Sequence, residues 1–152
     1  MVIVFSIVFA ASFNTIREDG IPWKAKPIEK VEDTSLLQEI INEPVIREIG
    51  LEVAVALHRE GSLFVDARAE EYLIDGYIPG AIADDDVERL SNAIDSLNGF
   101  DKGFVIYCSD DDCGSSEDLA YNLQDMGFNN ILVFKGGWKM WSEANLGVEY
   151  ND

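Results

Sequence analysis

Basic residues are scarce in this chain. Eleven lysines and arginines stand against 29 aspartates and glutamates, which gives a formal net charge of −18 over 152 residues. Nucleic-acid binding and docking on anionic lipid headgroups both require a basic footprint. The scarcity therefore excludes a nucleic-acid partner. It predicts a solvated acidic surface that favours solubility, densest between Ala83 and Asp118, where eleven acidic residues face only Arg89 and Lys102.

Histidine and cysteine are also rare, with one and two residues. Two cysteines do not make a disulfide scaffold, and alone they do not suffice for a structural zinc site. His58 lies in a predicted surface helix, so we expect an exposed side chain and few His-based mechanisms. The aspartate runs 84–86 and 110–112 lack the spacing of a calcium loop. We therefore predict no metal site and no cofactor, and keep cation binding by these runs as a weaker alternative.

The chain lacks an apolar run long enough to cross a bilayer, which takes about 20 residues. Residues 1–13, MVIVFSIVFAASF, carry no charge but number only thirteen, and no basic stretch precedes them as in a signal peptide. They fit the end of a membrane helix, a segment packed against another chain, or an ordinary core segment. We expect membrane or chain-to-chain association through them. The protein is then membrane-associated, on a side that the sequence does not fix, or cytoplasmic if the segment packs within it.

The length suits one domain with a substantial core. Residues 14–45 are predicted to be a linker with a short helix, because 19–30 contains two prolines and a glycine, leucines and isoleucines follow at 36–41, and Pro44 breaks that pattern. The domain itself is predicted at 46–152, with a first strand within 45–49 and a helix at 51–60.

From residue 63 onward, short apolar runs alternate with amphipathic helices. The runs at 63–65, 104–107 and 131–134 are too short for helices and rich in β-forming residues. Between them, one predicted helix places Val87, Leu90, Ile94 and Leu97 on one face and ends at Asn98-Gly99; another aligns Leu119, Ala120, Leu123 and Met126. This alternation predicts an α/β fold with a parallel sheet covered on both faces, whose reactive groups gather beyond the carboxyl ends of the strands.

Three predicted strand ends carry distinctive residues. The first is followed by Asp66-Ala67-Arg68 and the turn 76–81, GYIPGA; the second by Tyr107-Cys108; the third by Gly136-Gly137-Trp138. In this order and spacing, over roughly Ile46 to Tyr150, they resemble the rhodanese-like domain family. The resemblance implies a five-stranded parallel sheet with helices on both faces. It also implies that the cysteine takes a sulfane sulfur from a donor, holds it as a persulfide and passes it to an acceptor.

Cys108 is the candidate catalytic residue on physical grounds as well. A thiol between a strand end and a helix start faces backbone N–H groups and the positive end of the helix, and both favour the nucleophilic thiolate. Ser115 or Ser116 can cap that helix, and Ser115 with Asp118 has the spacing of a capping box. The alternative is a buried, inert cysteine.

The loop after Cys108 departs from the family pattern. The loop contains three carboxylates and no lysine or arginine, and the helix begins about two residues later than in the family. The loop residues are Ser109, Asp110, Asp111, Asp112, Cys113 and Gly114, and Ser115 follows them. Carboxylates disfavour an adjacent thiolate and repel anionic donors such as thiosulfate. Gly114 stands where phosphatase relatives of the fold need arginine, which excludes their chemistry. Tyr77 replaces the histidine of the family's turn, so no general base is supplied there.

Cys113 leaves two alternatives open. It could form a disulfide with Cys108 or resolve a persulfide on it, or it could be a spectator in an extended loop. Asp66 and Arg68 are predicted to brace neighbouring loops rather than to catalyse, and Trp138 and Trp141 to belong to the core.

The sequence thus predicts a sulfurtransferase or persulfide carrier acting through Cys108. Its partners would be a small-molecule or protein persulfide donor and a thiol acceptor. The alternative is a non-enzymatic binding or redox-sensing domain that uses the acidic loop with Cys108 and Cys113.

Overall fold

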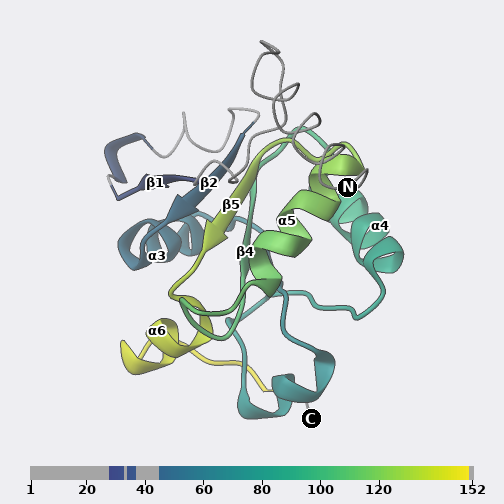
Figure 1. Ribbon diagram of the computed structural model, residues 1–152. Helices are drawn as coiled ribbons and strands as arrows, with labels where there is room; N and C mark the ends of the chain where they lie inside the picture. The colour runs from purple at the N-terminus through teal and green to yellow at the C-terminus, as the bar shows by residue number, and fades with distance from the viewer. Residues whose placement is uncertain (1–27, 33, 37–44, 151–152) are drawn as a thin grey trace, which may run out of the picture.

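Five parallel strands form the central sheet of the computed structural model, which describes residues 28–32, 34–36 and 45–150. The strands are ordered β1-β2-β5-β4-β3 (Figure 1). Their bounds are Glu29–Val31 for β1, Ile46–Ile49 for β2, Phe64–Asp66 for β3, Phe104–Tyr107 for β4 and Ile131–Phe134 for β5. The three apolar runs predicted as strands are therefore confirmed to within one residue, and so is the parallel five-stranded sheet.

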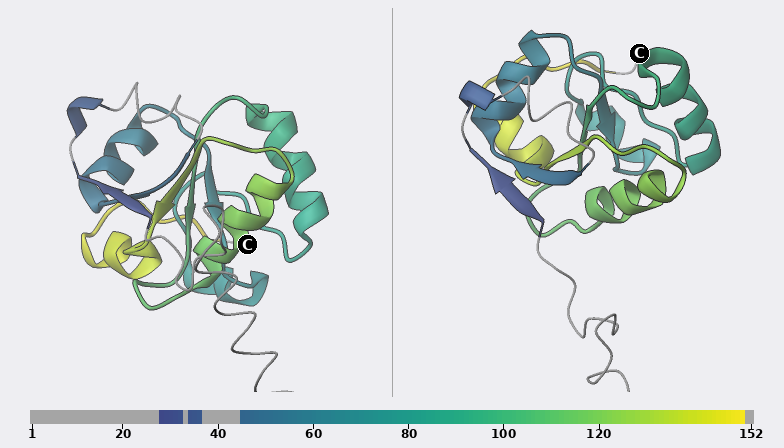
Figure 2. Two further views of the ribbon diagram at one scale, coloured as in Figure 1. Left: turned by 45° about the horizontal axis from the view of Figure 1, so that its top comes forward. Right: turned by 90° about the horizontal axis from the view of Figure 1, so that it is seen from above.

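Helices cover both faces of the sheet (Figures 1 and 2). Helices α3 (Leu51–Arg59) and α6 (Gly137–Glu143) lie on one face, and α4 (Val87–Asn98) and α5 (Ser115–Asp125) on the other. Two 3-10 helices, η1 (Thr34–Leu36) and η2 (Glu70–Asp75), complete the described elements. Alternate residues of each strand enter different cores: in β4, Val105 and Tyr107 pack with α3 and α6, and Phe104 and Ile106 with α4 and α5. Burial on both faces explains why β4 and β5 are continuous apolar runs in the sequence.

The parallel register brings the carboxyl ends of the strands to one edge. Tyr107, the last residue of β4, is paired with Asp66 of β3 on one side and with Phe134 of β5 on the other. The backbone N–H of Ala67 donates to the Tyr107 carbonyl at 2.8 Å, so the segment after β3 lies beside the end of β4. Residues from three strand ends are therefore neighbours, as the sequence predicts.

The predicted helix faces are right at their centres and wrong at their ends. Leu90 and Ile94 of α4 are buried, but Leu97 is 64% exposed, and Met126, just past α5, is 42% exposed. Leu97 lies in the last turn of α4, and Met126 is the C-cap of α5. The predicted stop of α4 is confirmed, because Gly99 takes a φ of 75° that favours glycine.

The sheet begins earlier in the chain than the sequence indicates. Glu29 and Lys30, inside the predicted linker 14–45, belong to β1, which pairs with β2 in parallel. A three-residue edge strand with two charged residues is too short to show the alternation of apolar and polar residues by which a strand is recognised. The apolar segment 1–13 lies outside the described residues, and its predicted role stays a prediction. Among the residues that are described, no helix is long and apolar enough to span a bilayer.

His58 is not the exposed surface residue that its neighbours suggest. Its Nε2 lies 2.8 Å from the Pro79 carbonyl oxygen, and its ring packs edge-on against Phe64 and Trp141. The prediction was wrong because the turn 76–81 folds back over the end of α3, a contact between segments distant in sequence. His58 therefore links α3 to this turn.

Candidate functional site

Cys108 lies directly after β4, in the loop that leads into α5. Its side chain is buried, whereas Asp111, Asp112 and Gly114 of the loop are exposed. The short strand places it there, because the run Phe104–Tyr107 is buried along its whole length and the chain leaves the sheet at the next residue. The loop is thus anchored at the sheet and open to solvent at its tip.

The first turn of α6 holds the base of this loop. The backbone N–H of Trp138 donates to the Cys108 carbonyl and that of Lys139 to the Ser109 carbonyl, both at 2.8 Å. Gly137 permits this approach: it has a φ of 54°, and a Cβ at this position would collide with the carbonyl oxygen of Cys108. Glycine at position 137 is therefore required by the backbone contact with the cysteine segment.

Cys108 and Cys113 are joined by a disulfide, with their Cα atoms 6.2 Å apart. This separation lies within the range that disulfides occupy. A turn brings Cys113 back: its N–H donates to the Asp110 carbonyl at 3.2 Å, and the Asp110 carboxylate accepts from the Asp112 N–H at 3.2 Å. Of the roles left open for Cys113, the structure thus shows the disulfide.

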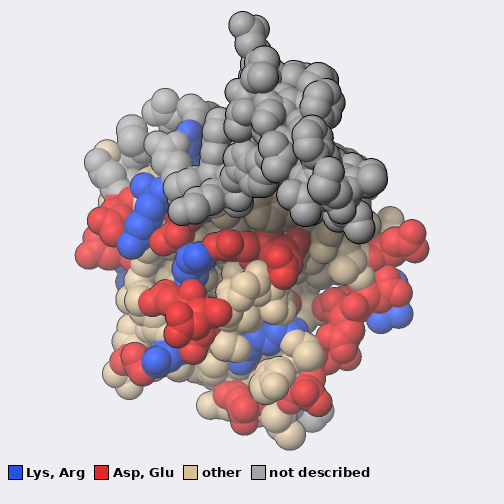
Figure 3. Space-filling model, in the orientation of Figure 1, with Lys and Arg blue, Asp and Glu red and all other residues tan. Residues whose placement is uncertain are grey.

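The loop carboxylates form the wall of a pocket of about 230 Å³. Asp110, Asp111 and Asp112 line it from one side and Lys139 and Glu143 of α6 from the other. One lysine against four carboxylates leaves this pocket negative. Acidic side chains also cover more of the face in Figure 3 than basic ones. The pocket therefore does not suit an anionic donor such as thiosulfate.

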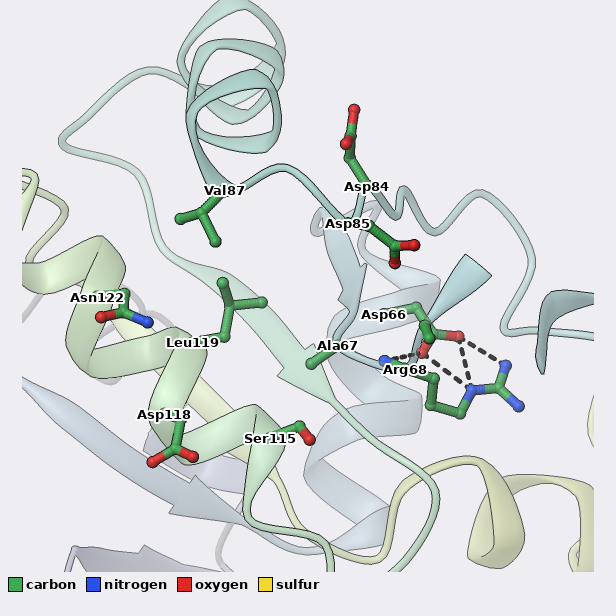
Figure 4. Close-up of a pocket in the computed structure, with 11 residues that line it drawn as sticks. Asp66, Ala67, Arg68, Asp84, Asp85, Val87, Ser115, Asp118, Leu119 and Asn122 are labelled. Atoms are coloured by element: carbon green, nitrogen blue, oxygen red, sulfur yellow. Dashed lines mark hydrogen bonds and ion pairs between the residues drawn. The ribbon is translucent and has the colours of Figure 1, made fainter. Parts of the chain in front are cut away.

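Asp66 and Arg68 form a buried ion pair one strand away. Arg68 Nε lies 3.0 Å from Asp66 Oδ1 and Arg68 Nη2 2.6 Å from Oδ2, with both side chains at most 3% exposed (Figure 4). Burial works to lower the pKa of Arg68, but the hydrogen bonds and charge of Asp66 outweigh it and raise that pKa. Arg68 also donates to the Gly76 carbonyl and lies 5.1 Å from the centre of the Trp138 ring.

These contacts connect the ion pair to the cysteine segment. Trp138 stacks against Arg68 through its ring and holds the Cys108 carbonyl through its N–H. Tyr107, next to the cysteine, accepts a hydrogen bond from the Ile78 N–H at 3.1 Å. Burial, reinforced by the charge of Asp66, raises the pKa of Tyr107 above its ordinary value, so its hydroxyl stays neutral. The pair thus ties three segments together around the end of β4.

A second pocket, of about 430 Å³, lies beside the ion pair (Figure 4). It is lined by the segment after β3, by Asp84 and Asp85, and by Ser115, Asp118 and Asn122 of α5. Asp84 is already paired with Arg89, whose hydrogen bond lowers the pKa of that carboxyl. Within residues 28–32, 34–36 and 45–150, no three His, Cys, Asp or Glu side chains are grouped to hold a metal ion. The aspartate runs therefore offer no such site in the described part of the chain.

The serines at the start of α5 do not cap it. Gly114 occupies the N-cap position, without a side-chain hydrogen bond, and Ser115 is already inside the helix. Ser116 is buried, and its Oγ has no hydrogen-bond partner among the described groups. The capping prediction was wrong because the helix starts one residue earlier, at the glycine that ends the turn.

The structure thus brings some of the site residues predicted from the sequence together. The Cys108 loop, the ion pair of Asp66 and Arg68, and Ser115 surround one edge of the sheet. The prediction missed the backbone contact of Gly137 with Cys108 and the link through the Trp138 ring, which is half-buried rather than fully in the core like Trp141. The adjacent glycines 136 and 137, one residue past the end of β5, were the available signal.

The family model described as rhodanese-like domain matches residues 51–144, more than half of the chain. A solution structure of the rhodanese-like domain of an Anabaena protein is 23% identical, covers 72% of this chain and 80% of that one, and has a TM-score of 0.56. A rhodanese-related protein from Thermoplasma volcanium is 25% identical over 69% of this chain and 99% of that one, with a TM-score of 0.52.

A third solved structure is a Rhodopseudomonas palustris protein of unknown function, described as a possible tyrosine phosphatase. It is 27% identical, with a TM-score of 0.52 over 86% of this chain and 100% of that one. No curated protein matches this chain significantly. The structural likenesses establish the fold, and the family match covers both the cysteine loop and the ion pair.

Proposed function

This chain belongs to the rhodanese-like domain family, and we propose that it is a sulfurtransferase or persulfide carrier that holds sulfane sulfur on Cys108. The observation that carries the proposal is the position of Cys108. It follows a buried strand, its carbonyl is fixed by Trp138, and its loop enters the N-terminus of an eleven-residue helix. The partial positive charge at that end of α5 favours the thiolate once the disulfide is reduced.

The proposed reaction begins with the reduced protein. The Cys108 thiolate attacks the outer sulfur of a donor persulfide, forms Cys108–S–SH, and displaces the donor as a thiolate. An acceptor thiolate then attacks the outer sulfur, takes it as its own persulfide, and releases Cys108 as a thiolate. No net oxidant is required, because sulfane sulfur is transferred between thiols. Asp66, Arg68 and Trp138 act as positioning residues that hold the cysteine segment.

The charge around the loop narrows the donor class. Asp110, Asp111, Asp112 and Glu143 outnumber Lys139 in the adjacent pocket, so the donor we propose is a low-charge small persulfide or a protein persulfide with a basic rim rather than thiosulfate. Phosphate-ester hydrolysis, as suggested for the Rhodopseudomonas palustris protein, is disfavoured because Gly114 offers no guanidinium.

Sulfur transfer from several donors to a thiol acceptor, with reductant present, tests this function. The wild type should transfer sulfur from a persulfide donor faster than from thiosulfate, and Cys108→Ser should show only the rate without protein. Cys113→Ser, which keeps Cys108 and removes the disulfide, is the matched control and should retain transfer. Equal rates for wild type and Cys108→Ser would refute the proposal.

A redox-sensing or binding domain is the second candidate, and the disulfide is the observation that favours it. Its opening would free the exposed tip of the acidic loop to change conformation. In that case reduction should alter affinity for a basic partner, and no donor should give sulfur transfer.

A further inference from the structure

The disulfide places the two sulfurs of this loop in bonding contact. Cys113 is brought there by the turn in which its N–H donates to the Asp110 carbonyl, and Cys108 is held by the hydrogen bond to Trp138. Both restraints are backbone hydrogen bonds that do not involve the sulfur atoms. The structure therefore shows that the loop can present the Cys113 sulfur to Cys108.

We propose that Cys113 resolves the persulfide on Cys108 and that the protein thereby releases hydrosulfide, an activity beyond sulfur transfer. The inference rests on the proposed function, because it requires Cys108–S–SH to form. The Cys113 thiolate attacks the inner sulfur, Sγ of Cys108. The bond from Sγ to the outer sulfur breaks, the Cys108–Cys113 disulfide forms, and the outer sulfur leaves as HS⁻.

Electrons balance within this step. The outer sulfur gains two electrons, and the two cysteine sulfurs lose two as they become a disulfide. The next turnover requires a dithiol reductant, which is oxidised to its own disulfide while Cys108 and Cys113 return to thiols. The product class is hydrosulfide, and the co-substrate class is a small or protein dithiol.

The choice of the inner sulfur follows from the geometry. Cys113 bonds Sγ of Cys108 itself in the structure, so the same approach in the persulfide reaches that atom. The leaving hydrosulfide is an anion. The loop has no lysine or arginine, and its three aspartates leave the adjacent pocket negative even with Lys139 present. This charge favours departure of the product over its retention.

A competition between two nucleophiles follows. An external thiol that attacks the outer sulfur carries it away as a persulfide, whereas Cys113 expels it as hydrosulfide. Because Cys113 is held in the same loop, its attack is intramolecular and gains the advantage of a high effective concentration. Hydrosulfide should therefore dominate when acceptor thiols are scarce.

A single-turnover experiment tests the inference. The full chain is reduced, freed of small thiols, and mixed with one equivalent of cysteamine persulfide, a small donor without a carboxylate. Hydrosulfide and intact protein mass are then followed in time. Wild type should release nearly one hydrosulfide per chain and end as the disulfide. Cys113→Ser should keep one added sulfur on Cys108 and release hydrosulfide about tenfold or more slowly.

A second variant keeps the number of thiols constant. Cys113→Ser combined with Ser96→Cys moves the second thiol to an exposed position on α4, and it should behave as Cys113→Ser does. Cys108→Ser should gain no sulfur and form no internal disulfide.

The two proposals fail in different ways. Sulfur that stays on the wild type as long as on Cys113→Ser would overturn the resolving role and leave persulfide formation intact. Equally fast hydrosulfide release from both, or release restored by the cysteine at position 96, would also overturn it. If Cys113→Ser gained no sulfur on Cys108, the proposed function itself would fail.

Discussion

Replacing Asp66 by Asn should cost far more stability than any loss of a surface charge. Asn has nearly the shape of Asp but no charge, so the variant leaves the Arg68 guanidinium, on a side chain that is 3% exposed, without its counter-ion. Arginine cannot shed its proton to escape this environment. Removing one partner of a buried ion pair costs about 3–5 kcal/mol. With a urea m-value of about 2 kcal/mol/M, the unfolding midpoint should fall by roughly 2 M.

The structure supplies a matched control for this experiment. Arg89 and Asp84 also form an ion pair, with an Nη2 to Oδ1 distance of 2.6 Å, but the Arg89 side chain is 66% exposed. Arg89→Gln should shift the urea midpoint little, since solvent screens exposed pairs.

A double variant separates the buried charge from lost packing. Asp66→Asn with Arg68→Met replaces the guanidinium by an apolar chain and should recover part of the stability that Asp66→Asn loses. The reasoning would be refuted if Asp66→Asn and Arg89→Gln lowered the midpoint equally, or if the double variant were less stable than Asp66→Asn alone.

Three further predictions concern the backbone contact, pH and the loop charge. Gly137→Ala should lower the urea midpoint of unfolding more than Gly61→Ala. Both positions have a positive φ, which costs about 1–2 kcal/mol for alanine, but only at position 137 would the new Cβ collide with the Cys108 carbonyl. Since folding raises the pKa of Tyr107, its contribution to stability should be complete below the pKa of an unfolded tyrosine, about 10, and should decrease as the pH rises above that value. Tyr107→Phe should weaken this pH dependence of the unfolding free energy. Identical pH profiles for wild type and variant would contradict the prediction. Changing the three loop aspartates (110–112) to Asn should speed alkylation of reduced Cys108 by iodoacetate several-fold at low salt and less at high salt; unchanged rates would mean that these carboxylates do not act on the sulfur.

Much of the sheet could be predicted because it is buried on both faces. The strands β4 and β5 are apolar throughout, and β3 is apolar until Asp66 at its end. The strand β1 could not be found in the same way, since it lies at the edge and is mostly charged. The burial of Leu97 and Met126 was misjudged because an apolar residue in a helical register is buried only where another element packs against it.

In the candidate site, too, local features could be predicted from the sequence and contacts between distant segments could not. Cys108 could be placed from local pattern, because a strand end and a helix start are local features. The packing of His58 under the turn at Pro79, and the link from Arg68 through Trp138 to Cys108, could not, since they join segments that only the fold brings together. The closure of the loop on Cys113 was open for the same reason, because spacing alone does not give the distance between two thiols.

The most direct test of sulfur chemistry at Cys108 is the intact mass of reduced Cys113→Ser after brief exposure to a persulfide donor, followed by peptide mapping of the adduct. We expect a gain of one sulfur atom, removable by a thiol and located on Cys108. No gain, or the same gain in the variant that lacks both cysteines, would contradict the assignment of Cys108 as the sulfur carrier.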